Sequence, residues 1–260
     1  MTEIWSATTG RHDAPHVTLI HGSLDRSAGL LKLSRRLDDR YCVTRYDRRG
    51  YGRSIPSDGP FGIDQHVADL HAVLTAPVER RRPRVLVGHS YGGRRPLALA
   101  QRAPELVDGV VTYETPLSWL EWWPGDSAGA NAVTLRRDPA LAAERFMRRL
   151  IGDERWERLP ASTRDARCRE GPAMVGELLD LRARPAWHGA EIEVPVMAIY
   201  GELGQPHHRR AAEAIASEIP TAEVCMLPGG RHPGPNTHPD QVAVLIHEFV
   251  EHRVRPTTPA

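Results

Sequence analysis

The chain has 260 residues, of which 40% are apolar, 26% charged and 6% aromatic, as in soluble globular proteins rather than disordered or fibrous ones. This length can bury the core of one large domain and still leaves room for an insertion. The 34 basic and 33 acidic residues give a net charge of +1, so no overall field attracts nucleic acid or an anionic membrane, and we expect neither as a partner. The sequence leaves a homodimer open.

The first half of the chain alternates between short β-branched or apolar runs and helical patterns. Strand and helix follow one another at 17–20 and 28–37, at 42–45 and 63–75, and at 85–87 and 94–102. Such alternation predicts an α/β fold in which helices cover both faces of a parallel sheet.

This rhythm stops after the apolar run 107–114. The segment 116–190 has no strand pattern and is rich in Arg, Glu, Ala and Leu, so we expect several short helices inserted as a cap. Alternation then resumes with a strand at 194–200, a helix at 207–219, a strand at 223–227 and a helix at 240–252. The predicted domains are therefore a core made of 1–115 and 191–260, and a helical cap made of 116–190.

The cysteines and the N-terminus bear on location. Cys42, Cys168 and Cys225 are odd in number and widely spaced, which argues against a disulfide framework and fits a reducing compartment. Residues 1–13 lack a basic region followed by an apolar run, and no stretch approaches the roughly 20 apolar residues that span a bilayer. We therefore expect a cytoplasmic protein.

A serine motif lies at a predicted strand-to-helix junction. Gly88-His89-Ser90-Tyr91-Gly92 matches Gly-x-Ser-x-Gly and separates the strand 85–87 from a helix that begins near Gly93. In such an elbow the serine sits on a strained turn that tolerates only small residues two positions to either side. The turn presents the hydroxyl at the carboxyl ends of the strands, near the N-terminus of a helix, which favours negative charge. The motif predicts Ser90 as a nucleophile.

Two further motifs accompany this elbow. His21-Gly22-Ser23 follows the strand 17–20 directly, and Asp47-Arg48-Arg49-Gly50-Tyr51-Gly52-Arg53-Ser54 follows the strand 42–45. Together the three motifs resemble those of the α/β-hydrolase family, with a likeness that runs from about residue 15 to 252 outside the cap. The resemblance implies the α/β-hydrolase fold, a mostly parallel sheet flanked by helices with a helical cap insertion. It also implies that the backbone N–H groups of Ser23 and Tyr91 form an oxyanion hole.

The general base is expected late in the chain, because the family order is nucleophile, acid, histidine. His232 ends the sequence Pro228-Gly229-Gly230-Arg231-His232, which follows the strand 223–227 and resembles the catalytic histidine loop of the family. An imidazole also has a pKa close to neutrality, as a general base requires. We predict His232 as the base. His238, which leads into the last helix, is the weaker alternative.

The orienting acid is where the sequence departs from the common pattern. Many relatives carry Asp in Gly-x-x-Asp after the strand that follows the cap, but here Gly201-Glu202-Leu203-Gly204 ends in glycine. Two carboxylates remain as candidates: Glu202 in that loop, and Glu114 after the earlier strand 107–113. Tyr113-Glu114-Thr115-Pro116 resembles a Tyr-Glu-Pro variant that some relatives use, so we favour Glu114 and keep Glu202 as the alternative acid.

The predicted pocket lies between cap and sheet, as cap insertions commonly cover the active site. We expect Leu24, Trp119, Trp122 and Trp123 to line it, although for each tryptophan simple packing of the cap is an equally good explanation. The pairs His207-His208 and His12-His16 lack a partnering carboxylate at ligand spacing, so we expect no metal. No organic cofactor is expected either.

These residues predict a serine hydrolase that cleaves a small-molecule ester, thioester or lactone through an acyl-enzyme on Ser90. Two alternatives stay open. One is a C–C bond hydrolase or lyase-like enzyme that uses the same triad, and the other is a catalytically silent member of the family that binds a small ligand.

Overall fold

One seven-stranded sheet organises the protein in this computed structural model, which describes residues 3–75 and 82–254. Its spatial order is β1-β3-β2-β4-β5-β6-β7, and all neighbouring strands run parallel except β1, which pairs antiparallel with β3. The mostly parallel sheet confirms the predicted fold class. The strands are β1 (Ser6–Gly10), β2 (His16–Ile20), β3 (Cys42–Tyr46), β4 (Arg84–His89), β5 (Gly109–Tyr113), β6 (Val196–Gly201) and β7 (Ala222–Leu227).

The strand β1 was not predicted from the sequence. Its residues Ser6–Gly10 are mostly small and polar, and they alternate between exposed and half-buried positions at the edge of the sheet. Such a strand is stabilised by pairing with β3 more than by an apolar pattern of its own. Sequence periodicity therefore gave no signal for it.

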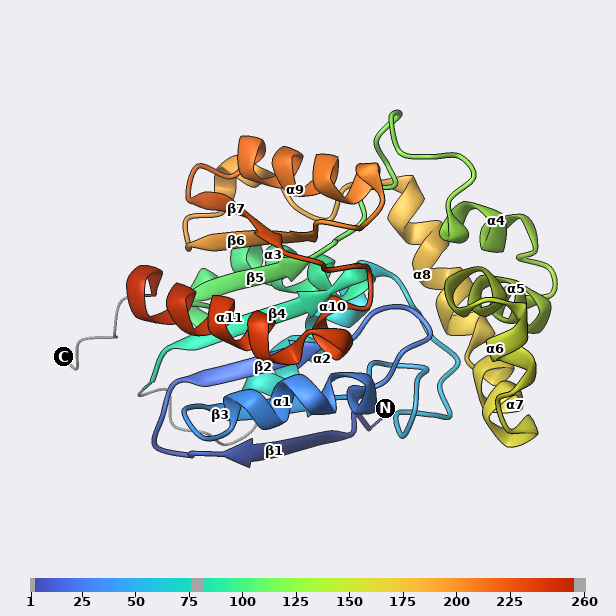
Figure 1. Cartoon of the computed structure of the whole chain (residues 1–260), viewed down its shortest axis with the longest axis horizontal. Helices are drawn as coiled ribbons and strands as arrows, with labels where there is room; N and C mark the ends of the chain where they lie inside the picture. Colours follow the sequence, from blue (N-terminus) through green and yellow to red (C-terminus); the bar gives the residue numbers. More distant parts are fainter. Residues whose placement is uncertain (1–2, 76–81, 255–260) are drawn as a thin grey trace.

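Helices cover both faces of the sheet (Figure 1). One face packs against α1 (Leu31–Leu37) and α11 (Pro239–Arg253), which contribute Leu33 and Ile246 to a buried apolar cluster. The other face packs against α2 (Ile63–Thr75), α3 (Arg94–Arg102) and α9 (Pro206–Glu218) in a second cluster. Every strand and helix predicted for the core is present, with bounds that differ by a few residues at most.

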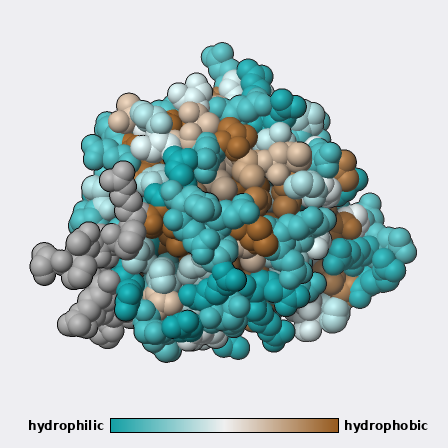
Figure 2. All heavy atoms as spheres, turned by 60° about the vertical axis from the view of Figure 1, so that its left-hand side comes forward, coloured by the Kyte–Doolittle hydropathy of each residue, from teal (hydrophilic) through white to brown (hydrophobic). Residues whose placement is uncertain are grey.

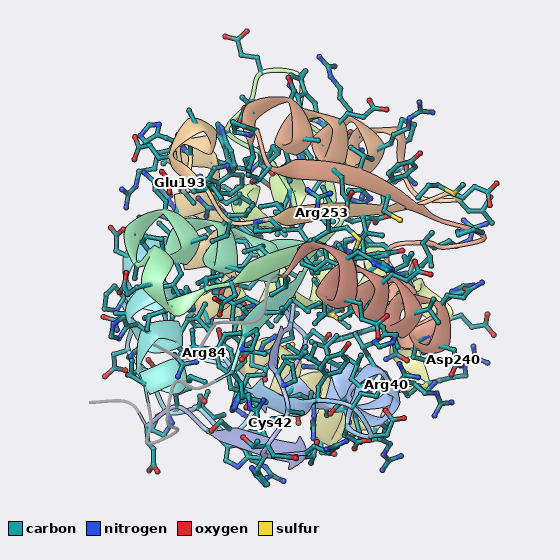
Figure 3. All side chains as sticks on the ribbon, turned by 90° about the vertical axis from the view of Figure 1, so that its left-hand side faces the viewer. Arg40, Cys42, Arg84, Glu193, Asp240 and Arg253 are labelled. Carbon is teal, nitrogen blue, oxygen red and sulfur yellow. The ribbon has the colours of Figure 1, made fainter. Side chains whose placement is uncertain are left out.

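The end of α11 is held against the last strand of the sheet. Arg253, labelled in Figure 3, forms an ion pair with Glu223 of β7 at 2.6 Å and also donates to the carbonyl of Thr221. This contact joins the final helix to the sheet edge.

Five helices form the predicted insertion between β5 and β6, and Figure 1 shows them beyond the carboxyl ends of the parallel strands. All five lie inside the predicted range 116–190. A third apolar cluster joins cap residues such as Trp156 and Met174 to Tyr51 and Tyr91 of the core. The helices are α4 (Ala128–Thr134), α5 (Pro139–Ile151), α6 (Asp153–Glu157), α7 (Ala161–Arg169) and α8 (Gly171–Ala183).

The face drawn in Figure 2 is mostly hydrophilic, with hydrophobic residues in small separate groups. Among the described helices, none is both long enough and apolar enough to cross a membrane.

The short helix α10 (Gly234–Thr237), which connects the predicted histidine loop to α11, was also not predicted.

Candidate active site

Ser90 lies at a sharp junction between sheet and helix. The strand β4 ends at His89, Ser90 opens a single turn of 3-10 helix (Ser90–Gly93), and α3 follows directly. A β-carbon at Gly92 would collide with the backbone of Ile20 and His21, so a glycine is required where this turn packs against β2. The local structure is thus the elbow that the motif predicts.

Left-handed backbone conformations gather at this site. In the described part of the chain, three residues other than glycine have a positive φ: Leu24 at 50°, Ser90 at 54° and Glu114 at 49°. Such a conformation is unfavourable for residues with a β-carbon, and it persists only where the surrounding structure imposes it. Ser90 and Glu114 each follow the end of a strand, and Leu24 follows Ser23 in the loop after β2. The fold therefore imposes strain at three places around one site.

Glu114 and His232 are joined directly. His232 Nδ1 lies 2.7 Å from Glu114 Oε2, and the other carboxylate oxygen accepts the backbone N–H of Gly201 at 3.0 Å. Glu114 is 1% exposed, whereas the imidazole of His232 is 30% exposed. Glu202 points elsewhere, because its carboxylate is exposed and accepts the backbone N–H of Gly229 at 2.8 Å. The geometry brings Glu114, not Glu202, to the histidine.

The surroundings of Gly204 explain why no carboxylate stands at the position where many relatives carry their acid. A β-carbon at this residue would lie 2.5 Å from Glu114 Oε1 and 2.9 Å from the carbonyl oxygen of Gly201. The carboxylate of Glu114 thus occupies the space that a side chain at position 204 would need. The two positions exclude one another, so the glycine at 204 and the carboxylate of Glu114 are one structural feature.

The loop that carries His232 is fixed by two side chains of the sheet, the buried Tyr113 and the half-buried His89. The Tyr113 hydroxyl donates to the carbonyl of Arg231 at 2.8 Å, and His89 Nε2 donates to the carbonyl of His232, also at 2.8 Å. Burial, together with the neighbouring His232, lowers the pKa of His89 to about 4, so this ring acts as a neutral donor. His238 directly precedes α11, and its Nδ1 lies 2.8 Å from the hydroxyl of Thr237.

A second imidazole approaches the same carboxylate. His208, in the first turn of α9, places Nδ1 2.7 Å from Glu114 Oε2. Its ring stacks on that of His232, with centroids 4.8 Å apart and planes 21° from parallel. The expectation that His207-His208 lacks a carboxylate at ligand spacing was therefore wrong. Glu114 comes from another strand, and sequence spacing could not reveal the contact.

Glu114, His208 and His232 also form a group of described residues that could share an ion, since their ligand atoms lie within 4.8 Å of one another. However, the hydrogen bond from His232 already engages Oε2. We therefore interpret the group as a hydrogen-bonded pair, Glu114 and His232, with the His208 ring packed beside it.

The electrostatics of the cluster favour an ionised acid and a neutral base. Burial alone would raise the pKa of Glu114, but the two imidazoles at Oε2 outweigh burial and hold that pKa well below its ordinary value. Burial lowers the pKa of His232, and the hydrogen bond to Glu114 opposes this only in part. At neutral pH the carboxylate is thus charged and the His232 ring is unprotonated.

A cavity of about 440 Å³ opens between the sheet and the cap. Ser90, Glu114 and His232 all line it, together with Ser23 and Tyr91, the two residues predicted to supply the oxyanion hole. A β-carbon at Gly22 would lie only 3.5 Å from Ser90 Oγ, which places the loop after β2 against the serine. The Ser23 hydroxyl faces away from this role, since it donates to Glu177 of the cap at 3.3 Å.

Of the four residues predicted for the pocket, Trp123 alone is among those that line this cavity. Trp119 instead packs edge-on against Trp187, with ring centroids 5.2 Å apart, and Trp122 packs against Trp123 and Arg210. Leu24 is 3% exposed and belongs to the apolar cluster shared by cap and core. The cap supplies other apolar lining residues, which the sequence analysis did not single out: Phe146, Leu150, Leu178 and Leu181.

A model of the alpha/beta hydrolase family matches residues 19–245, which is most of the chain. The protein belongs to this family. The family match covers the elbow, the histidine loop and the helical insertion between β5 and β6.

Individual alpha/beta hydrolases are similar over most of their length. The chain is 25% identical over 254 residues to 2-(acetamidomethylene)succinate hydrolase of Mesorhizobium japonicum, with 91% of this chain and 88% of the relative covered. It is 31% identical over 186 residues to a pimeloyl-[acyl-carrier protein] methyl ester esterase of Aromatoleum aromaticum, covering 64% and 73%. The crystal structure of the enol-lactonase from Burkholderia xenovorans superposes with a TM-score of 0.75 at 22% identity, covering 96% of both chains, and so shares the fold.

Proposed function

We propose that this protein is a serine hydrolase that cleaves a small-molecule ester, thioester or lactone. The observation that carries the proposal is the 2.7 Å contact between His232 Nδ1 and Glu114 Oε2 at a cavity that Ser90 also lines. A carboxylate on Nδ1 fixes the tautomer that leaves Nε2 free to accept a proton. This is the state that a general base for Ser90 requires.

In the proposed mechanism, His232 accepts the Ser90 proton while Ser90 Oγ attacks the carbonyl carbon of the substrate. The backbone N–H groups of Ser23 and Tyr91 stabilise the oxyanion, a contribution of about 3 kcal/mol for each donor. The His232 imidazolium then protonates the leaving group. In the second half of the cycle His232 deprotonates a water molecule that attacks the acyl carbon, and it returns this proton to Ser90 Oγ as the acid product leaves. Glu114 stays ionised throughout and stabilises the imidazolium.

The cavity favours a compact substrate with an apolar part. Its volume of about 440 Å³ is in the ordinary range for small-molecule sites. Phe146, Leu178 and Leu181 offer an apolar wall, while Ser118 and Gln205 offer polar groups. The names of two proteins of similar sequence or fold, a methyl ester esterase and an enol-lactonase, also support ester or lactone chemistry.

A fluorophosphonate probe tests the nucleophile. We expect the native protein to be labelled at Ser90 and Ser90→Ala to remain unlabelled. An unlabelled native protein would favour a silent, ligand-binding role instead. Short and long p-nitrophenyl esters, a lactone and a meta-cleavage diketone, assayed in parallel, would then separate ester or lactone cleavage from C–C bond cleavage.

Two matched variants test the acid. Glu114→Gln removes the charge that orients and stabilises His232, and we expect kcat for ester turnover to fall by roughly 10³-fold or more. Glu202→Gln changes an exposed carboxylate that contacts only loop backbone, and we expect kcat to stay within about twofold. The reverse result, with only the Glu202 variant impaired, would transfer the role to Glu202.

A further inference from the structure

His208 is the one residue of the cluster that the triad does not use. It is 9% exposed, its Nδ1 has no hydrogen-bond partner, and that atom nevertheless lies 2.7 Å from Glu114 Oε2. A buried polar nitrogen without a partner is costly, so its persistent placement beside a carboxylate calls for a role.

The fold places His208 there by several contacts. Pro206 occupies the first turn of α9, and the backbone N–H of His208 donates to the carbonyl of Gln205 at 2.9 Å. The ring stacks on that of His232, with centroids 4.8 Å apart, and also meets the ring of His207 edge-on at 4.3 Å. Trp123 packs edge-on against His207 at 4.7 Å. The imidazole therefore has little freedom to leave the carboxylate.

Among the charged groups around these rings, Glu114 is the anion that lies next to both His208 and His232. Glu114 comes from the end of β5, His232 from the loop after β7, and His207 from α9 itself. Farther out, Asp126 of the cap acts electrostatically on His207, and Asp25 acts on His89, whose ring lies 5.0 Å from that of His232. Because a single carboxylate oxygen faces two imidazoles, a positive charge on one ring disfavours a positive charge on the other.

We propose that His208 is a positioning residue that shares Glu114 with His232 and thereby keeps the base unprotonated to a lower pH. This inference rests on the proposed function, since it assigns His232 as the base. His208 Nδ1, which lies 2.7 Å from Oε2, competes with His232 for the charge of that oxygen. Less of that attraction then remains to stabilise a proton on His232 Nε2.

The sign of the effect follows from this competition. Replacing His208 by Phe keeps a ring on His232 but removes the competing nitrogen, so Glu114 acts on His232 alone and favours its protonated form. We expect the pKa of His232 to rise by roughly 0.5 to 1 unit in His208→Phe. His208→Gln, which keeps a neutral N–H donor, should shift it less.

Two measurements test the proposal. An NMR titration of the His232 ring, assigned with a His232→Gln variant, reports the pKa whether or not Ser90 reacts. The pH dependence of fluorophosphonate labelling reports the same group through the nucleophile, and its acid limb should move to higher pH in His208→Phe. His71→Phe is the control, because this exposed histidine of α2 does not line the cavity, and we expect its acid limb to stay in place.

The outcomes are distinct. An unlabelled native protein would overturn the proposed function, and the NMR titration would still decide the role of His208. An unchanged His232 pKa in His208→Phe would overturn the inference. So would a loss of labelling that is equal at every pH, since that result indicates a purely structural role. His208→Gln supplies the same comparison if the Phe variant fails to fold.

Discussion

Glu114 and Gly204 follow adjacent strands, β5 and β6, and they compete for one small volume beside His232. A carboxylate can reach the histidine from either strand end, because the carboxyl ends of parallel strands meet at the same edge of the sheet. The side chain from β5 fills the space here. At the scale of residues, the acid of this site is therefore defined by a pair of positions.

This exchange predicts that the acid can be moved back. Gly204→Asp alone should lower kcat strongly, because its β-carbon would collide with Glu114 Oε1. Glu114→Ala removes the collision with Oε1 and leaves only the 2.9 Å approach to the carbonyl oxygen of Gly201 to relax. In the double variant the new aspartate can then approach His232 from β6. We expect the double variant to turn over p-nitrophenyl esters at least about tenfold faster than Glu114→Ala alone. Equal rates in these two variants would contradict the shared-volume explanation.

At the scale of elements, the segment between β5 and α4 carries tryptophans of two kinds, some that pack against other side chains and one that lines the cavity. Trp119 and Trp123 lie four positions apart, but Trp119 packs on Trp187 while Trp123 lines the cavity and contacts His207. The sequence presents the two tryptophans as equivalent. Their neighbours in the folded protein differ, so Trp119 contributes to packing and Trp123 to the cavity wall.

Alanine substitutions should separate these tasks. Trp119→Ala leaves a void against Trp187 and should lower the free energy of unfolding by about 3 kcal/mol, with KM for a bound ester little changed. Trp123→Ala removes cavity wall and should raise KM for bulky esters severalfold. Urea unfolding and steady-state kinetics on both variants check the prediction. An unchanged KM in Trp123→Ala would remove this residue from the pocket.

At the scale of the whole molecule, one buried carboxylate of the cap is bound by four segments of the core. Glu177 of α8 pairs with Arg48 and Arg95, accepts the Tyr51 hydroxyl at 2.7 Å, and accepts the Ser23 hydroxyl at 3.3 Å. A further nitrogen, His66 Nε2, lies 3.0 Å from Glu177 Oε1. These contacts reach the loops after β2 and β3, and the helices α2 and α3. Glu177 thus ties the cap to the loop that carries Ser23.

Removing this charge should destabilise the protein strongly. In Glu177→Gln, Arg48 and Arg95 stay fully buried but lose their anion, and we expect unfolding to become easier by roughly 3 to 5 kcal/mol. Glu213→Gln, which removes the anion of the exposed pair with Arg209, is the control and should leave the unfolding curve nearly unchanged. Similar unfolding midpoints for the two variants would show that the cap is held mainly by apolar packing.

The sequence by itself determined the features that depend on neighbouring residues. Ser90 and His232 were predicted because the turn that presents each one needs glycine at fixed offsets along the chain. The strand and helix order followed from apolar periodicity in the same way. Glu114 was favoured over Glu202 from a local motif, and the geometry at His232 agrees with that choice.

Only the tertiary structure decided the features that depend on residues far apart in the chain. The pairing of β1 with β3, the approach of His208 to Glu114 and the burial of Glu177 among arginines join segments that no local spacing relates. The physical reason is that the local sequence fixes backbone conformation and apolar periodicity. The partners of buried charges are determined only when the helices and the cap pack against the sheet. Ser90 and His232 could thus be singled out from the sequence, whereas their electrostatic surroundings arise from the fold.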